Sequence, residues 1–370
     1  MKTKETVSLC MIVKDEEDCL LAAIQSVQDL TDEVIIIDTG SIDSTPQLAL
    51  AAGAKLFKLD WTADFSLARN FALKQASSDW ILFLDADEVL EPIVPEIFNK
   101  LLNNVHIEGY FLRIKNILGP TLGESYDEVV RLFRNRPIYQ FEGAIHEQIA
   151  PSILRANNGS SLASALLTLN HFGYLSNRLQ SKEKFSRNCN ILFEELDKNP
   201  SNPFLHYCLG LEYYQRDFIT EGLQHLTKAI TRMSGNEGYF EDILHNIAFG
   251  YLRLEETIKL IDFLSQAMVM YPDQSDFLFL RGNAYLSQAN YHEAAEDFNH
   301  LLEILGTRTS KSNSDNAKNI SYTFLTLALK EIQFCSLALK RQALEPMHSK
   351  AKNKINGALK EAFLFFIQRK

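Results

Sequence analysis

The chain has 370 residues, of which 46% are hydrophobic, and a formal net charge of −10. This length suffices for two domains that each bury a core, and the acidic balance argues against nucleic-acid binding by bulk electrostatics, which needs a basic surface. The sequence contains no run of 18 apolar residues and no signal peptide, so we expect a cytoplasmic protein without a transmembrane segment. Five scattered cysteines without a Cys-x-x-Cys pair indicate neither a zinc site nor a disulfide framework.

The N-terminal part alternates predicted strands with predicted helices. Continuous apolar runs predict strands at 7–13, 33–38 and 55–59, and helical periodicity follows the first of them. Pro46 marks the start of a second helix, which ends near Gly53. Almost uniformly apolar strands that alternate with helices predict a mostly parallel sheet covered on both faces, the α/β class.

A further apolar strand, 80–84, is followed by two carboxylates, Asp85 and Asp87. In open α/β sheets ligands bind at the carboxyl ends of strands, which is where these residues stand. Mg²⁺ and Mn²⁺ take oxygen ligands, commonly one or two carboxylates together with phosphate oxygens. The turn therefore predicts a site for a divalent cation and a diphosphate, with a solvated turn as the ordinary alternative.

Four segments follow one another in a characteristic order: 8–17 (SLCMIVKDEE), 37–45 (IDTGSIDST), 64–70 (DFSLARN) and 84–88 (LDADE). In order and spacing they closely resemble the family 2 glycosyltransferases of GT-A fold. The resemblance implies inverting transfer of a sugar from a nucleotide-diphosphate donor, with a UDP-sugar as the expected donor and Mn²⁺ or Mg²⁺ as cofactor. It implies a nucleotide site formed by Lys14, Glu16, Asp38, Asp43, Arg69, Asn70 and Asp85. It implies a metal site formed by Asp85, Asp87 and His171.

An inverting displacement also needs a base, which takes the acceptor's proton on the face of the sugar opposite the leaving group. Glu147 falls where the family's catalytic carboxylate is expected, although His146-Glu147 stands in place of the commoner Glu-Asp pair. Glu142 is therefore the alternative base. His146 is interpreted as a ligand, a hydrogen-bond partner or an ordinary buried imidazole.

Three arginines, Arg131, Arg134 and Arg136, lie close together just before this region. Their forked donors suit phosphate or an acceptor carboxylate. A solvated strand edge explains them equally well, so we do not include them among the predicted site residues.

Beyond Tyr174 the chain changes to helical patterns. We predict a GT-A domain over 1–175, a linking helix over 176–200, and an all-α domain of tetratricopeptide-like repeats over 201–370 that ends in capping helices. Three tyrosines mark the first helix of each repeat, and the last two lie 34 residues apart, the period of such repeats: Tyr213, Tyr251 and Tyr285.

Stacked helix pairs form a solenoid with a concave surface, which here predicts binding of a peptide or protein acceptor. The architecture resembles bacterial enzymes that glycosylate ribosomally made peptides. The alternatives are a buttress or a homodimer contact for the repeats, a lipid-linked or polysaccharide acceptor, or a non-catalytic repeat-containing binding protein. A loop is predicted from Gly306 to Asn319, and the basic amphipathic end at 350–370 suits a capping helix or contact with a membrane surface.

Overall fold

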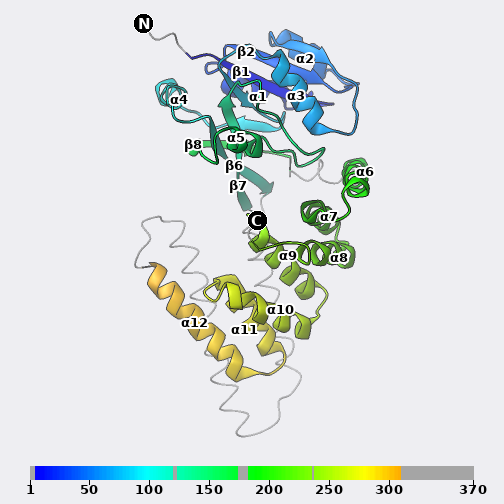
Figure 1. Cartoon of the computed structure of the whole chain (residues 1–370), viewed down its shortest axis with the longest axis vertical. Helices are drawn as coiled ribbons and strands as arrows, with labels where there is room; N and C mark the ends of the chain where they lie inside the picture. Colours follow the sequence, from blue (N-terminus) through cyan, green and yellow to red (C-terminus); the bar gives the residue numbers. More distant parts are fainter. Residues whose placement is uncertain (1–4, 120–122, 174–181, 236, 310–370) are drawn as a thin grey trace. The chain divides into compact units, whose positions relative to one another are not determined.

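The computed structural model describes residues 5–119, 123–173, 182–235 and 237–309 (Figure 1). They divide into two compact units, one that ends at Lys198 and one that begins at Asn199. The described part of the first unit contains one eight-stranded sheet, and that of the second contains helices only. The predicted fold class, an α/β domain followed by an all-α region, is confirmed.

One half of the sheet is parallel. Its four strands lie in the order β3 (Lys55–Lys58), β2 (Glu33–Asp38), β1 (Val7–Val13) and β4 (Trp80–Phe83). All three pairings among them are parallel. This half follows the sequence pattern directly, because strands buried on both faces are continuous apolar runs.

The other half changes direction at β4. The order continues with β7 (Gly123–Arg134), β6 (Gly109–Gly119), β8 (Leu162–His171) and β5 (Glu88–Leu90). The β4–β7, β7–β6 and β8–β5 pairings are antiparallel, and only β6–β8 is parallel. The sheet is therefore mixed, and its antiparallel pairings were not predicted.

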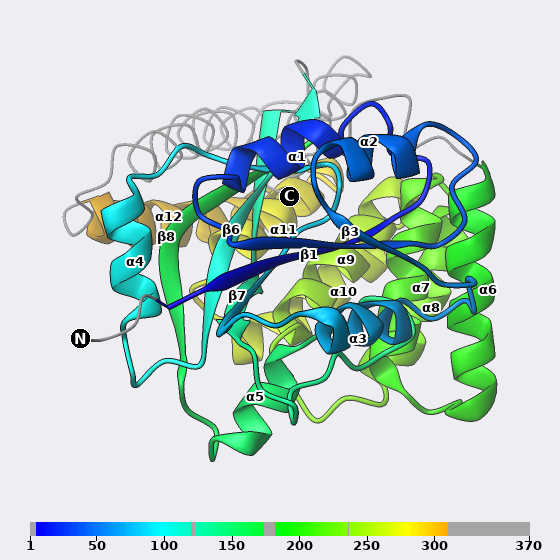
Figure 2. The same ribbon diagram turned by 90° about the horizontal axis from the view of Figure 1, so that it is seen from above.

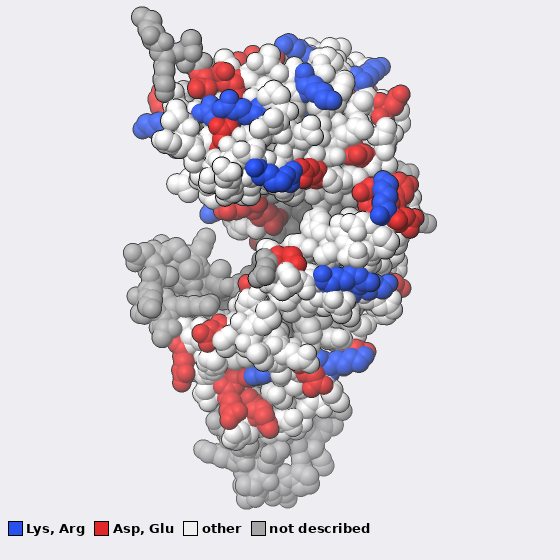
Figure 3. Space-filling model, in the orientation of Figure 1, with Lys and Arg blue, Asp and Glu red and all other residues white. Residues whose placement is uncertain are grey.

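Helices cover both faces of the sheet (Figure 2). One face packs against α1 (Leu20–Val27), α2 (Thr45–Ala51) and α4 (Pro95–Leu102), and the other against α3 (Phe65–Gln75) and α5 (Ala150–Ala156). Successive side chains of β1 point to opposite faces of the sheet. Leu9 and Met11 pack in the core with α1, α2 and α4, and Cys10 packs in the core with α3 and α5. On the face drawn in Figure 3, basic and acidic side chains of this unit lie interspersed.

The described part of the second unit, which ends at residue 309, consists of three helix pairs. They are α7 (Pro203–Gln215) with α8 (Ile219–Ile230), α9 (Phe240–Arg253) with α10 (Thr257–Met270), and α11 (Ser275–Ser287) with α12 (Tyr291–Thr309). Within the first pair the backbones approach closely, because a Cβ atom on Gly222 would lie 2.9 Å from the carbonyl oxygen of Gly210. Each of the three marker tyrosines lies in the first helix of its pair.

Two predictions concern the ends of the helical region. Helix α6 (Lys182–Lys198) lies within the predicted linking segment, and the exact domain boundaries stay predictions. Helix α12 continues through Gly306 to Thr309, so the predicted start of the loop is wrong; Leu301 and Ile304 of this helix are buried in the core. The rest of that loop and the capping helices lie outside the described residues. Within the described part of the chain, no helix is long and apolar enough to cross a membrane.

A single carboxylate ties the first strands together at their amino ends. Glu33, at the start of β2, accepts hydrogen bonds from the Ser8 hydroxyl at 2.5 Å and the Ser77 backbone N–H at 2.6 Å, and it pairs with Lys55 Nζ at 2.7 Å. Its side chain is 9% exposed. Burial opposes the charge, but the bonds from Lys55, Ser8 and Ser77 outweigh it and lower the pKa of Glu33 to about 2.

We expect Glu33→Gln to destabilise the chain by about 1–3 kcal/mol at neutral pH, because buried donors lose a charged acceptor. Since the folded-state pKa is depressed, this contribution is present above the unfolded pKa near 4.5 and is lost as the pH falls toward 2. Urea unfolding of both proteins from pH 7 to pH 3 measures the difference, with the exposed Glu96→Gln as control. An equal deficit at both ends of that pH range contradicts the assignment.

Candidate active site

The turn from β4 into β5 sends its two carboxylates in different directions. The backbone N–H of Asp85 donates to Glu88 Oε2 at 3.0 Å, which holds the turn closed. Strand β5 pairs antiparallel with β8, with Glu88 opposite His171, and the Phe172 N–H donates to the Asp87 carbonyl at 3.0 Å. This pairing brings Asp87 beside His171 and leaves Asp85 toward the middle of the sheet.

Helix α3 carries Arg69 into the site. The helix begins at Asp64, whose side chain caps it by accepting from the Leu67 N–H at 2.9 Å. It then buries the side that holds Ala68, Arg69 and Ala72 against the sheet. The guanidinium carbon of Arg69 lies 4.5 Å from the centre of the Phe83 ring, so an always-charged group is held over an aromatic face in the interior.

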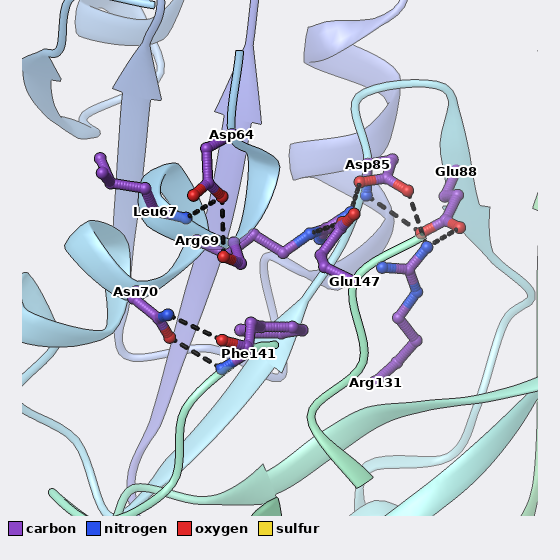
Figure 4. A network of polar contacts seen from close by, with 10 residues as sticks. Asp64, Leu67, Arg69, Asn70, Asp85, Glu88, Arg131, Phe141 and Glu147 are labelled. Carbon is purple, nitrogen blue, oxygen red and sulfur yellow. Dashed lines mark hydrogen bonds and ion pairs between the residues drawn. The ribbon is translucent and has the colours of Figure 1, made fainter. Parts of the chain in front are cut away.

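Arg69 joins two carboxylates from distant parts of the chain (Figure 4). Its Nη2 donates to Asp85 Oδ1 at 2.9 Å, and its Nε donates to Glu147 Oε1. Burial disfavours the charge of Asp85, but Arg131 and Arg69 outweigh that effect and hold the pKa of Asp85 well below its usual range. One planar guanidinium therefore sets Asp85 and Glu147 on the same side of the sheet.

The loop after Phe141 places the two candidate bases in different surroundings. Two backbone hydrogen bonds of 3.0 Å between Glu142 and Gln148 close it. Inside the closed loop, the Glu147 side chain is 9% exposed and reaches Arg69, whereas the Glu142 side chain is 44% exposed and pairs with Arg155. The geometry thus brings Glu147, and not Glu142, to Asp85.

Two histidines of this region lie in different settings. His146 has a positive φ of 54° and an exposed side chain, so its interpretation as a buried imidazole is wrong. His171 Nε2 lies 3.6 Å from Asp87 Oδ2, while its Nδ1 is 2.7 Å from Asn116 Oδ1. Burial lowers the pKa of His171, but the hydrogen bond and charge of Asp87 outweigh it and raise the pKa above its usual value.

Arg131 is a site residue that the sequence interpretation left out. Its Nη2 contacts Asp85 Oδ2 at 2.7 Å and Glu88 Oε1 at 2.5 Å, and the residue is buried. The antiparallel pairing of β7 with β4 places Arg131 beside Asp85, and no local sequence pattern predicts that pairing. Arg134 instead binds backbone carbonyls, and Arg136 pairs with Glu108.

The loops that follow β1 and β2 bind each other at the carboxyl ends of the two strands. The Asp15 N–H donates to Ser41 Oγ at 3.0 Å, and the Ile42 N–H donates back to Asp15 Oδ1 at 2.8 Å. Asp38 is buried and accepts from the Ser41 N–H at 3.0 Å. Asp43 accepts from the Glu17 N–H at 3.1 Å. The structure therefore gathers Asp38 and Asp43 into one preformed rim.

The other predicted nucleotide residues differ in how their side chains are engaged. Lys14 is exposed at this rim, and Glu16 Oε2 accepts from the Cys19 thiol at 3.0 Å. Asn70 binds the backbone of Phe141 with both ends of its amide, at 2.9 and 2.8 Å. Asn70 thus anchors the loop that carries Glu147, and its role in nucleotide binding stays a prediction.

Asp87 and His171 are suited to hold a divalent cation together with phosphate oxygens. A Cβ atom on Gly173 would lie 2.5 Å from His171 Nε2 and 2.6 Å from Asp87 Oδ2, so the space between these two atoms depends on glycine. Both oxygens of Asp85 accept from arginines. No set of three or more Asp, Glu, His or Cys side chains suited to a metal ion occurs among the residues that the structure describes. A divalent cation held by Asp87 and His171 would need its remaining ligands from phosphate oxygens and water, as is common for Mg²⁺.

Comparison with known proteins shows what this part of the chain is similar to. The family described as glycosyl transferase family 2 matches residues 8–146. A TPR repeat-containing protein of Synechococcus elongatus is 40% identical over 55% of this chain and 51% of its own length. The SPbeta prophage-derived glycosyltransferase SunS of Bacillus subtilis is 26% identical over 75% of this chain and 66% of its own length. The chain thus spans about half to two thirds of these relatives.

Similar solved structures are more remote. Staphylococcus aureus TarS has a TM-score of 0.38 at 13% identity, covering 69% of this chain and 54% of its own. Glucosyl-3-phosphoglycerate synthase of Mycobacterium tuberculosis, solved with Mn²⁺ and UDP-glucose, has a TM-score of 0.34 at 17% identity, covering 50% of this chain and 78% of its own.

We expect Gly173→Ala to weaken Mn²⁺ binding in the presence of UDP by about 10–100-fold, the usual range for disturbing the surroundings of metal ligands. The added methyl group enters the space between Asp87 and His171. Electron paramagnetic resonance of free Mn²⁺ measures the affinity, and Gly238→Ala, with open space around its Cβ position, is the matched control. An unchanged affinity in the Gly173 variant contradicts the cation site.

Proposed function

We propose that this chain, whose residues 8–146 match glycosyl transferase family 2, is an inverting glycosyltransferase that moves a sugar from a UDP-sugar to an acceptor. The observation that supports the proposal most strongly is the Arg69 bridge. Arg69 pairs both with Asp85, on the turn after β4 that we assign to the diphosphate, and with Glu147, the proposed base. An inverting displacement needs its leaving-group site and its base on opposite faces of one sugar ring. Because one guanidinium holds both carboxylates, the turn assigned to the leaving group and the proposed base lie close enough to act on the same sugar ring.

We assign the cation to Asp87 and His171, with Asp85 held in place beside them. When bound, the ion acts as a Lewis acid that stabilises negative charge on the departing diphosphate. Arg131 fixes the turn, since it binds both Asp85 and Glu88. The preformed rim after β1 and β2, which contains Asp38 and Asp43, is assigned to the nucleoside.

The chemical step follows from this arrangement. A lone pair of the acceptor atom forms the new bond to the anomeric carbon, and the bond from that carbon to the diphosphate oxygen breaks with its electron pair on UDP. Glu147 takes the proton that the acceptor loses. Because Arg69 holds Oε1 of Glu147, we assign Oε2 to the acceptor.

The acceptor we propose is a peptide or protein side chain presented by the helical unit. Three helix pairs of tetratricopeptide type support this choice, because such pairs expose a continuous helical surface that suits an extended chain. A relative that matches at 40% identity is also named for such repeats. A panel of peptide, lipid-linked and polysaccharide acceptors, offered to the full chain with radiolabelled donor, distinguishes this class from the others.

Two substitutions test the proposed roles without needing the acceptor, because water can replace it. We expect Glu147→Gln to bind UDP with Mn²⁺ as wild type does but to release UDP from UDP-glucose or UDP-N-acetylglucosamine about 10²–10⁴-fold more slowly, the usual effect of losing a general base. Asp87→Asn should lose Mn²⁺-dependent UDP binding. Calorimetric titration and a UDP-release assay measure these quantities.

The exposed Glu142→Gln is the matched control, because it removes the alternative base by the same change. Its UDP release should equal that of wild type. Full activity of the Glu147 variant, or loss of activity in the Glu142 variant, contradicts the assignment of the base. If UDP binds equally well without Mn²⁺, and Asp87→Asn does not weaken that binding, the assignment of the cation is contradicted.

A further inference from the structure

Asn116 is a buried polar residue at the metal-binding end of the sheet, and no motif of the sequence assigns it a role. Strand β6 lies between β7 and β8, and Asn116 stands opposite Ser125 on one neighbour and His171 on the other. The residue is 3% exposed. A buried amide needs partners for both of its ends.

The partners fix which way the amide points. Asn116 Nδ2 lies 2.7 Å from Asp127 Oδ2 and 3.3 Å from Ser125 Oγ. A carboxylate oxygen accepts hydrogen bonds, so the amide NH₂ must face Asp127 and the amide oxygen must face His171. That oxygen only accepts, and it lies 2.7 Å from His171 Nδ1. The hydrogen in this contact therefore belongs to Nδ1.

This hydrogen determines what His171 offers to the site. A neutral imidazole with its hydrogen on Nδ1 keeps a lone pair on Nε2. Nε2 faces Asp87 Oδ2 across 3.6 Å, so a lone pair and a carboxylate oxygen converge on one point. In the other tautomer an N–H would point at Asp87 and occupy the place of a cation.

We propose that Asn116 and Asp127 are positioning residues that hold His171 in the Nδ1–H tautomer and so make the Asp87–His171 pair a ligand for a divalent cation. Histidine ligands commonly depend on a partner at the other ring nitrogen, and loss of that partner costs about 10–100-fold in metal affinity. The inference about affinity rests on the proposed function. The inference about the tautomer does not.

The tautomer is measured directly on the full chain. Long-range proton–nitrogen spectra of metal-free protein labelled with [¹⁵N]histidine, at a pH that keeps imidazoles neutral, separate the two forms, and His171→Gln assigns the signal. The variants are Asn116→Leu, which removes the amide, and Asp127→Asn, which lets the Asn116 amide turn. Asp127 is exposed, so its variant keeps the test valid if the buried change impairs folding. Tyr126→Phe, on the same strand, is the control, because its hydroxyl binds Glu124 instead.

Wild type should show the Nδ1–H form, Asn116→Leu should lose it, and Asp127→Asn should give a mixture. Mn²⁺ affinity in the presence of UDP is measured by electron paramagnetic resonance of free Mn²⁺. It should fall about 10–100-fold in Asn116→Leu, less in Asp127→Asn, and not in Tyr126→Phe. Persistence of the Nδ1–H form in both variants overturns the proposal. A changed tautomer with unchanged affinity overturns the role in cation binding.

A wild-type chain that binds no Mn²⁺ in the presence of UDP has a different meaning. It contradicts the cation of the proposed function, and with it the effect on affinity. The spectra alone then decide whether Asn116 sets the tautomer.

Discussion

The site depends on a buried guanidinium, that of Arg69, which cannot lose its charge. The residue is 6% exposed and its guanidinium lies over the rings of Phe83 and Phe141, so its charge must be balanced by carboxylates from within the fold. Asp85 and Glu147 supply that balance. Removing either carboxylate leaves the buried charge of Arg69 only partly balanced, and unpairing a buried charge typically costs several kcal/mol. Stability and the geometry of the site are therefore coupled through this one side chain.

The change of direction within the sheet explains why the two carboxylates of one turn have different partners. Asp85 stays with the strands at the centre, where Arg131 of β7 reaches it. Asp87 follows β5 to the far edge of the sheet, where β8 brings His171. The parallel half supplies the loops assigned to the nucleoside, and the antiparallel pairings supply the groups assigned to the cation. The proposed transfer site lies where the two halves meet.

Much of the fold was predictable, because buried parallel strands are continuous apolar runs. The bounds predicted for the first two strands, 7–13 and 33–38, are those of β1 and β2. The antiparallel pairings were not predictable, because the register between distant strands has no local signature in the sequence. For that reason the sequence did not distinguish a binding role for Arg131 from a solvated strand edge, whereas the structure shows it buried beside Asp85.

The assignment of site residues reached a similar limit. The motifs predict Asp85, Asp87 and Glu147 as site residues, but the different surroundings of Glu147 and Glu142 became visible only with the closed loop between Glu142 and Gln148. Asn116 could not be identified at all, because its position matters only once β6 lies between β7 and β8. Residues that bind ligands directly fall in recognisable patterns, whereas residues that orient them depend on tertiary pairing.

The stereochemistry of donor hydrolysis tests the central claim most directly. The full chain is incubated with α-linked UDP-glucose or UDP-N-acetylglucosamine. Proton NMR spectra recorded before the free sugar mutarotates show which anomer is released first. A base and a leaving-group site on opposite faces of the sugar predict the β-anomer. Initial release of the α-anomer would contradict inverting transfer and the role of Glu147 as its base.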